Sequence, residues 1–196
     1  MTGTTIARQL ILAGTIAACA AEPALAGNPA DSPEQTKAIG IDVARRIRAV
    51  RIDGGKLAID GLLEEAAWRG AAEGTGFTQT EPHDGEPATE RTSVRLLYDD
   101  RAIYVGIRAF DDEAERICAR LARRDDECRS DWVYVYFDSY DDNRTAFCFC
   151  VNPAGSRMDG LVFDDNSLDM NWDAVWDVGT SIDDDGWTAE FAIPFS

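Results

Sequence analysis

The stretch TSVRLLYDDRAIYVGIRAF, residues 92–110, decides the fold of this chain. Two runs rich in β-branched, aromatic and aliphatic residues, 92–98 and 102–110, flank the short polar segment 99–101. In the second run every other residue from Ile103 to Ala109 is apolar, which places these side chains on one face of a strand. Two such runs joined by a tight polar turn predict an antiparallel β-hairpin.

The same kind of pattern continues on both sides of the hairpin. Short β-type runs are separated by turns rich in Gly and Asp, and one segment, 62–68, has helical spacing instead. Many short strands at regular spacing favour a mostly β, antiparallel β-sandwich over a parallel sheet. The further strands are expected at residues 48–52, 77–79, 132–137, 146–152, 158–163, 175–182 and 187–193.

The chain stops directly after an apolar strand, at Ile193-Pro194-Phe195-Ser196. A strand that ends in this way is expected to leave an open sheet edge, which native proteins usually cover. We therefore expect the β-sandwich, residues 47–196, to be C-terminally incomplete and to lack its last strands.

The composition of the N-terminal region is typical of a targeting segment. Leu10 to Ala18 is apolar but only about half as long as a bilayer-spanning helix. Ala24-Leu25-Ala26 is a small-x-small cleavage site, so residues 1–26 are predicted to be a signal peptide and residues 27–46 a linker. A second interpretation is a lipobox that places a lipid on Cys19. Both interpretations predict export to the periplasm, the cell surface or the medium.

The formal net charge is -17, and it stays at -17 without residues 1–26, which hold one cation, Arg8, and one anion, Glu22. Such a charge repels phosphate backbones, so nucleic-acid binding is excluded as a function class. The acidic loops are either solvated turns or cation sites, since hard cations prefer clustered carboxylate oxygens. The calcium candidates are Asp138, Asp141, Asp164 and Asp165, and neither loop matches the EF-hand pattern.

Four cysteines lie in the predicted domain: Cys118, Cys128, Cys148 and Cys150. An even number in an oxidising compartment allows two disulfides. Cys148 and Cys150 are two apart in a strand and share a face, so pairing across to Cys118 and Cys128 is preferred to pairing with each other. The alternative is four reduced, buried thiols that act as small apolar residues.

Neither a nucleophile elbow nor a zinc-protease motif occurs, and His83 is the only histidine. Asp131, Asp138 and Glu190 lie in strands or at their ends, where a raised pKa could suit acid–base catalysis. Capping of turns and strand-end amides explains them more simply. We predict no catalytic residue, and a domain that is not an enzyme on its own.

The tryptophans suggest a binding role. Trp172 and Trp176 are four apart, which fits one face of a helical turn, and Trp132 lies in a strand. Exposed indole rings stack on the apolar faces of sugars, so these three are the sugar-binding candidates. The alternative for each is packing in the core.

A series of motifs occurs in a fixed order along residues 48–196. The motifs are Ile59-Asp-Gly61, Glu65-x-x-Trp68, residues 91–100, Ile103-Tyr104-Val-Gly106, Asp111, Arg124-Asp125, Asp131-Trp-Val, Phe137-Asp138, Asn152-Pro-x-Gly155 and Gly186-Trp-x-x-Glu190-x-x-Ile193-Pro194-Phe195. Taken together, they resemble the carbohydrate-binding module family 9-like domain. The chain looks most like the version at the front of exported bacterial proteins whose C-terminal region resembles an outer-membrane barrel. The resemblance implies a β-sandwich that binds sugars and in some members calcium.

The sugar site that the resemblance implies is substituted here. The positions of a stacking tryptophan, a carboxylate and an arginine hold Cys128, Tyr134 and Cys150. A second stacking tryptophan falls beyond Ser196. Sugar recognition would therefore need other aromatic residues.

Three functions follow as hypotheses. The first is a non-catalytic module that binds an oligo- or polysaccharide, linked to carbohydrate catabolism. The second is a periplasmic or surface interaction domain without sugar affinity, which packs on an outer-membrane partner or its own missing barrel. The third is part of a hydrolase acting on O-glycosyl compounds, since related domains are attached to such enzymes.

Overall fold

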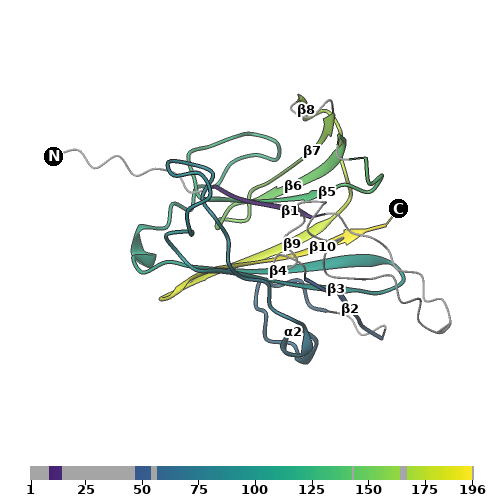
Figure 1. The fold of residues 1–196 in the computed structure, drawn as a ribbon, viewed down its shortest axis with the longest axis horizontal. Helices are drawn as coiled ribbons and strands as arrows, with labels where there is room; N and C mark the ends of the chain where they lie inside the picture. Colours follow the sequence, from purple (N-terminus) through teal and green to yellow (C-terminus); the bar gives the residue numbers. More distant parts are fainter. Residues whose placement is uncertain (1–8, 15–46, 54–56, 143, 164–166, 196) are drawn as a thin grey trace, which may run out of the picture.

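The structure is a computed structural model of the chain, and it describes residues 9–14, 47–53, 57–142, 144–163 and 167–195. Two sheets of five strands lie face to face, and their strand orders are β1-β5-β6-β7-β8 (sheet A) and β2-β3-β4-β10-β9 (sheet B) (Figure 1). The strands are β1 Gln9–Gly14, β2 Val50–Arg51, β3 Thr92–Tyr98, β4 Ala102–Phe110, β5 Trp132–Phe137, β6 Ala146–Val151, β7 Arg157–Phe163, β8 Ser167–Asp169, β9 Asp177–Asp183 and β10 Gly186–Pro194.

The hairpin of residues 92–110 forms as predicted. Strands β3 and β4 pair antiparallel, with Tyr98 opposite Ile103. The Asp99 carboxylate closes the turn, because its Oδ1 accepts hydrogen bonds from the backbone N–H groups of Arg101 (2.8 Å) and Ala102 (2.9 Å). The bond from Arg101 is the main reason why the pKa of Asp99 lies below its usual value.

Strand β10 does not form a sheet edge. It pairs with β4 on one side and with β9 on the other, both antiparallel. The expectation of an open edge at residues 187–193 was therefore wrong. Pairing with β4, which is distant along the chain, places β10 inside sheet B.

Two strand pairs are parallel. Strand β1 lies beside β5, and the short β2 lies beside β3. The sequence predicted a signal peptide over residues 1–26, and the structure uses Gln9–Gly14 of that segment as a strand of sheet A. Among the described residues, no helix has the length and hydrophobicity needed to cross a bilayer.

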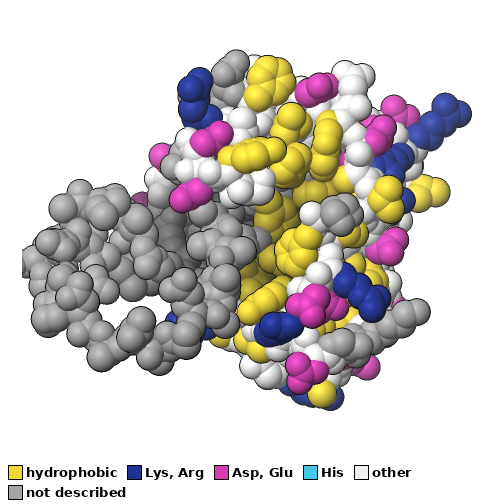
Figure 2. Space-filling model, turned by 90° about the vertical axis from the view of Figure 1, so that its right-hand side faces the viewer, with side chains coloured by type: hydrophobic (Ala, Val, Ile, Leu, Met, Phe, Trp, Pro, Cys, Tyr) yellow, Lys and Arg dark blue, Asp and Glu magenta, His cyan; other side chains and the backbone are white. Residues whose placement is uncertain are grey.

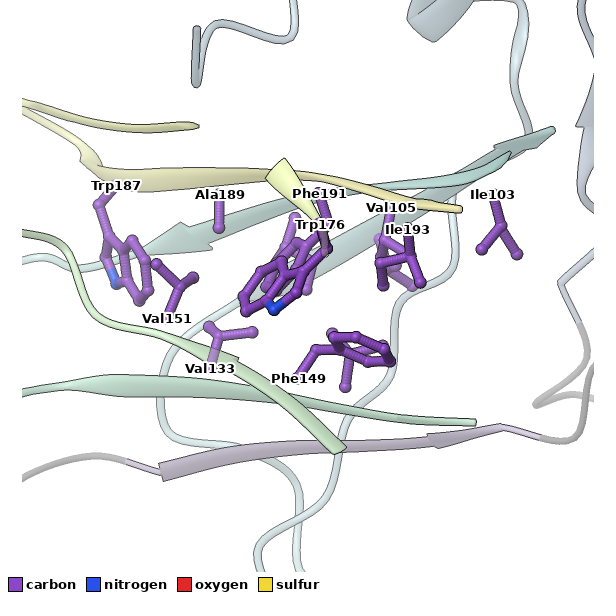
Figure 3. Packing of buried hydrophobic residues seen from close by; sticks show 13 residues of the cluster. Ile103, Val105, Val133, Phe149, Val151, Trp176, Trp187, Ala189, Phe191 and Ile193 are labelled. Carbon is purple, nitrogen blue, oxygen red and sulfur yellow. The ribbon is translucent and has the colours of Figure 1, made fainter. Parts of the chain in front are cut away.

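The core lies between the two sheets (Figure 3). Val133, Phe149 and Val151 point inward from sheet A, and Phe191 and Ile193 point inward from β10. Burying one such side chain stabilises the fold by about 1.5–3 kcal/mol. Because successive side chains of a strand point to opposite faces of the sheet, these residues all lie in the one layer between the sheets.

A buried carboxyl group ties the N-terminal part of the domain to the outer face of sheet B. The helix α2, Ala66–Gly70, lies against this face, and it is shorter than the helix predicted at residues 62–68. Glu190 Oε1 accepts a hydrogen bond from Trp68 Nε1 (2.9 Å), and Oε2 accepts bonds from the backbone N–H groups of Asp60 and Gly61 (3.2 Å each). Gly106 makes room for this packing, since a Cβ there would lie 3.0 Å from the Trp68 ring.

Candidate functional site

The face of sheet A that points away from the core is lined by aromatic rings and sulfur. Strand register places Tyr134 of β5 opposite Cys150 of β6, and Cys150 opposite Met158 of β7. We call this set the outer-face cluster. Its buried members are Trp132, Tyr134, Cys148, Cys150 and Met158, and Cys128, Tyr136, Val162 and Met170 pack against them.

The outer-face cluster contains all three substituted positions of the sugar site that the resemblance implies. Tyr134 and Cys150 face each other across β5 and β6, and Cys128 packs against the same group. The three positions therefore come together in space. They present a hydroxyl, thiols and rings where the resemblance implies a stacking indole, a carboxylate and a guanidinium.

Trp132 belongs to this cluster and is 3% exposed. Its Nε1 donates a hydrogen bond to the carbonyl of Cys128 (3.1 Å), and its ring is tilted against Tyr134. The sequence offered Trp132 as a stacking surface for a sugar. At 3% exposure its ring has no face open to a sugar in this structure.

Trp176 lies in the core, also 3% exposed, with its ring stacked on Phe191 and edge-on to Phe149 (Figure 3). Residues 172–176 are not helical. The expectation that Trp172 and Trp176 share one face of a helical turn was therefore wrong. The segment joins β8 to β9 without a helical turn, and Trp176 lies in the core, where it cannot stack on a sugar from solvent in this structure.

Trp172 keeps part of its surface exposed. Its ring centroid lies 4.8 Å from that of Phe147 at the start of β6, and Tyr140 follows at 6.4 Å from Phe147. Tyr140 is 70% exposed. We call Tyr140, Phe147 and Trp172 the aromatic row.

The aromatic row joins the loop between β5 and β6 to the crossover that follows β8. Hydrophobic side chains gather in a hollow on the end of the molecule where β10 finishes, and charged side chains border it (Figure 2). Sequence reasoning found Trp172 but missed its two neighbours. Tyr140 stood in a polar turn and Phe147 in an apolar strand, and only the fold brings them to Trp172.

The loop beside Tyr140 uses its carboxylates to hold its own backbone. Asp138 Oδ1 accepts bonds from the N–H groups of Tyr140 (3.2 Å) and Asp142 (3.3 Å). Asp142 accepts from Arg144 and Thr145 (2.8 Å each), and these bonds lower the pKa of Asp142. Asp141 is exposed, with a left-handed φ of 54°. The other two calcium candidates, Asp164 and Asp165, lie outside the described residues.

Among the described residues, one set of three carboxylates comes within 4.8 Å: Asp125, Asp159 and Asp173. The sequence did not single it out. Arg124 already supplies a cation there, with Nη2 2.6 Å from Asp159 Oδ1 and 3.6 Å from Asp173. Asp159 Oδ2 also accepts the N–H of Ala174 (2.5 Å). This set therefore anchors the crossover segment to sheet A.

The four cysteines that the structure describes, Cys118, Cys128, Cys148 and Cys150, are free. Cys118 Sγ donates to the carbonyl of Arg129 (3.3 Å), and Cys128 Sγ donates to that of Arg120 (3.5 Å). Cys148 Sγ and Cys150 Sγ lie 3.3 Å apart. The expected pairing across to Cys118 and Cys128 is not formed here: these two thiols contact loop carbonyls, while those of Cys148 and Cys150 contact each other.

The carboxyl groups considered for catalysis are engaged in the fold. Asp131 Oδ2 accepts the N–H of Cys118 (2.9 Å), and Asp138 holds its turn. Burial raises the pKa of Glu190 to about 7, but the side chain is fully buried beneath Trp68. A substrate cannot reach it without displacing α2.

No protein-family model matches the sequence, and no curated protein matches it. Solved structures match the fold. A carbohydrate binding module family 9 from Caldicellulosiruptor kristjanssonii in complex with cellotriose has a TM-score of 0.53 at 17% identity, over 76% of this chain and 68% of that chain. A structure from the same organism in complex with glucose has a TM-score of 0.53 at 16% identity, over 76% and 70%.

A candidate carbohydrate-binding protein from Bacteroides uniformis also matches, with a TM-score of 0.57 at 13% identity, over 76% of this chain and 72% of that chain. At these identities the likeness establishes the fold. The sequence expectation of a mostly β sandwich of the family 9 type is confirmed.

Proposed function

We propose that this chain is a non-catalytic carbohydrate-binding module that contacts its oligo- or polysaccharide through the aromatic row. The observation that supports the proposal most directly is the placement of Trp172, which packs on Phe147 but keeps exposed surface beside the exposed Tyr140. The fold supports it independently, since two matching structures hold cellotriose and glucose.

The chemistry of the row suits a pyranose. The C–H faces of a sugar ring are apolar and stack on electron-rich aromatic faces, while its hydroxyl groups need hydrogen-bond partners. Asn171 and Asp173 are the sequence neighbours of Trp172 and are both exposed, so they are candidates for bonds to the sugar hydroxyls. Carboxylates and amides accept bonds from sugar hydroxyls.

The test is a binding titration of the purified chain against a glycan panel that includes glucose and cellotriose, followed by calorimetry or affinity electrophoresis. We expect Tyr140→Ala and Trp172→Ala to lose binding. Val175→Ala is the matched control, because Val175 is 92% exposed on the same crossover and lies outside the row. Flat titrations across soluble and insoluble glycans would overturn the proposal.

A second candidate is an interaction domain without sugar affinity. Burial of Trp68, Trp132, Trp176 and Trp187 favours it, because most of the indole surface is used inside the fold. We propose for this case an outer-membrane partner of an exported protein. A sugar-negative chain that co-purifies with membranes through a saturable contact would support the second candidate against the first.

Export itself is a proposal from the leader-type N-terminus. It predicts a processed protein that begins at Gly27, or one that carries lipid on Cys19. Mass spectrometry of the protein from fractionated cells distinguishes the two. A full-length protein in the cytoplasm would refute both, and with them the proposed link to polysaccharide catabolism outside the cell.

A further inference from the structure

Two thiols meet in the middle of the outer-face cluster. Cys148 and Cys150 are 1% and 2% exposed, and their sulfur atoms are 3.3 Å apart. Both side chains leave β6 on the same face, and aromatic residues of β5 stand directly opposite them: Tyr136 at Cys148 and Tyr134 at Cys150. The thiols are therefore held together in an apolar, aromatic environment.

Thioether sulfur lies on the other side of the same thiols. Met158 of β7 is paired directly with Cys150, and Gly160 is paired with Cys148. A Cβ at Gly160 would lie 2.9 Å from Leu168 Cδ1 and 3.1 Å from Met170 Sδ, so the missing side chain leaves space that these two residues occupy. Strand register thus places the Met158 side chain beside the pair, and Met170 packs against the same cluster.

We propose that Cys148, Cys150 and Met158 form a binding site for a soft monovalent metal ion, Cu(I). Thiolate and thioether ligands select Cu(I) over hard cations, which prefer oxygen. Zinc usually takes four ligands, and here two thiols are supplied without a histidine. Binding through both sulfur atoms releases the two thiol protons to solvent and leaves a Cu(I) bis-thiolate with a net charge of −1, and the surrounding rings keep water away from the ion.

The experiment adds Cu(I) anaerobically to the reduced full chain in the presence of a chromophoric Cu(I) chelator. We expect one Cu(I) per chain, with an ultraviolet thiolate-to-copper charge-transfer band and an increase in melting temperature. The double variant Cys148→Ala/Cys150→Ala is expected to bind about 100-fold more weakly or worse, at least the loss seen when supporting groups of metal sites are removed. Cys118→Ala is the matched control and should bind as the wild type does.

Met158→Leu tests the thioether separately. Leucine keeps the apolar volume, so folding should be preserved while Cu(I) affinity falls about 10-fold. The proposal is overturned if the wild type fails to compete with glutathione for Cu(I), or if the double variant, folded by circular dichroism, binds Cu(I) as tightly as the wild type. If the double variant does not fold, the wild-type competition and Met158→Leu decide the question.

Discussion

The interior between the sheets and the outer face of sheet A are built from alternate residues of the same strands. On β5, Val133 and Val135 point inward, while Trp132 and Tyr134 point outward. All four are buried, yet the inner layer is mainly aliphatic and aromatic hydrocarbon and the outer one contains sulfur and hydroxyl groups. Both faces of a sheet can therefore be closed to solvent while only one has the composition of an ordinary core.

The largest loss in the free energy of unfolding is expected from a substitution at the centre of the interior. Phe191→Ala should lower the free energy of unfolding by about 3–5 kcal/mol, because the ring is fully buried against Trp176 and its loss leaves a cavity. Urea denaturation measures the change. A loss below about 1 kcal/mol would mean that the sheets close over the gap and that the interior is not the rigid layer described.

On the outer face of sheet B, the buried Glu190 makes the free energy of unfolding depend on pH. The pKa of Glu190 is raised from 4.5 to about 7, mainly by burial. Between these pH values the unfolded chain has lost its proton and the folded chain keeps it, so the free energy of unfolding falls as pH rises, by at most about 3 kcal/mol. Denaturation series at pH 5 and pH 7.5 measure this.

Glu190→Gln is the control for the pH effect. The amide cannot ionise, so the fall between pH 5 and 7.5 should flatten, while overall stability drops because its NH₂ group cannot accept the bonds that the carboxyl accepts. If the free energy of unfolding of Glu190→Gln still falls between pH 5 and 7.5, the pH dependence belongs to another group. Asp99 and Asp183 do not interfere, since their lowered pKa values confine their contribution to pH below about 4.

The outer-face cluster should tolerate truncation better than the interior. Met158→Ala is expected to cost about 2 kcal/mol, at the low end for buried methionine, because partly exposed residues at the rim such as Val162 can move inward. Thermal or urea unfolding of Met158→Ala and Phe191→Ala gives the ratio of the two losses in the free energy of unfolding. Equal losses would show that the two layers are packed alike.

The smallest stability effect is expected at the aromatic row. Tyr140→Ala should change the free energy of unfolding by less than about 0.5 kcal/mol, because the ring is 70% exposed. The same variant should lose glycan binding under the proposed function. A large loss of stability would reassign Tyr140 from ligand contact to structural support.

The parts predicted well from sequence are those with local causes. The hairpin of residues 92–110 follows from alternation and a polar turn, and both act within a few residues. The position of β10 depends on pairing with β4 across a long stretch of chain, which no local pattern encodes. That is why the expected sheet edge at residues 187–193 was wrong.

The site was harder to predict for the same reason. Spacing of four suggested that Trp172 and Trp176 act together, but residues 172–176 are not helical, and Arg124 fixes this crossover by binding Asp159 and the Ala174 carbonyl. The two indoles therefore separate, one toward the core and one to the rim. The predicted alternation in β5 did place Trp132 and Tyr134 on one face, but it could not tell whether that face was open.

The distribution of tryptophan has a practical meaning for spectroscopy. Trp68 reports on the outer side of one sheet, Trp132 on the outer side of the other, and Trp176 and Trp187 on the space between them. Each layer thus carries its own fluorophore, and substituting all but one by phenylalanine would let unfolding be followed layer by layer. It also means that Trp172 emits against four sheltered indoles, so a ligand signal from it will be a small change on a bright background.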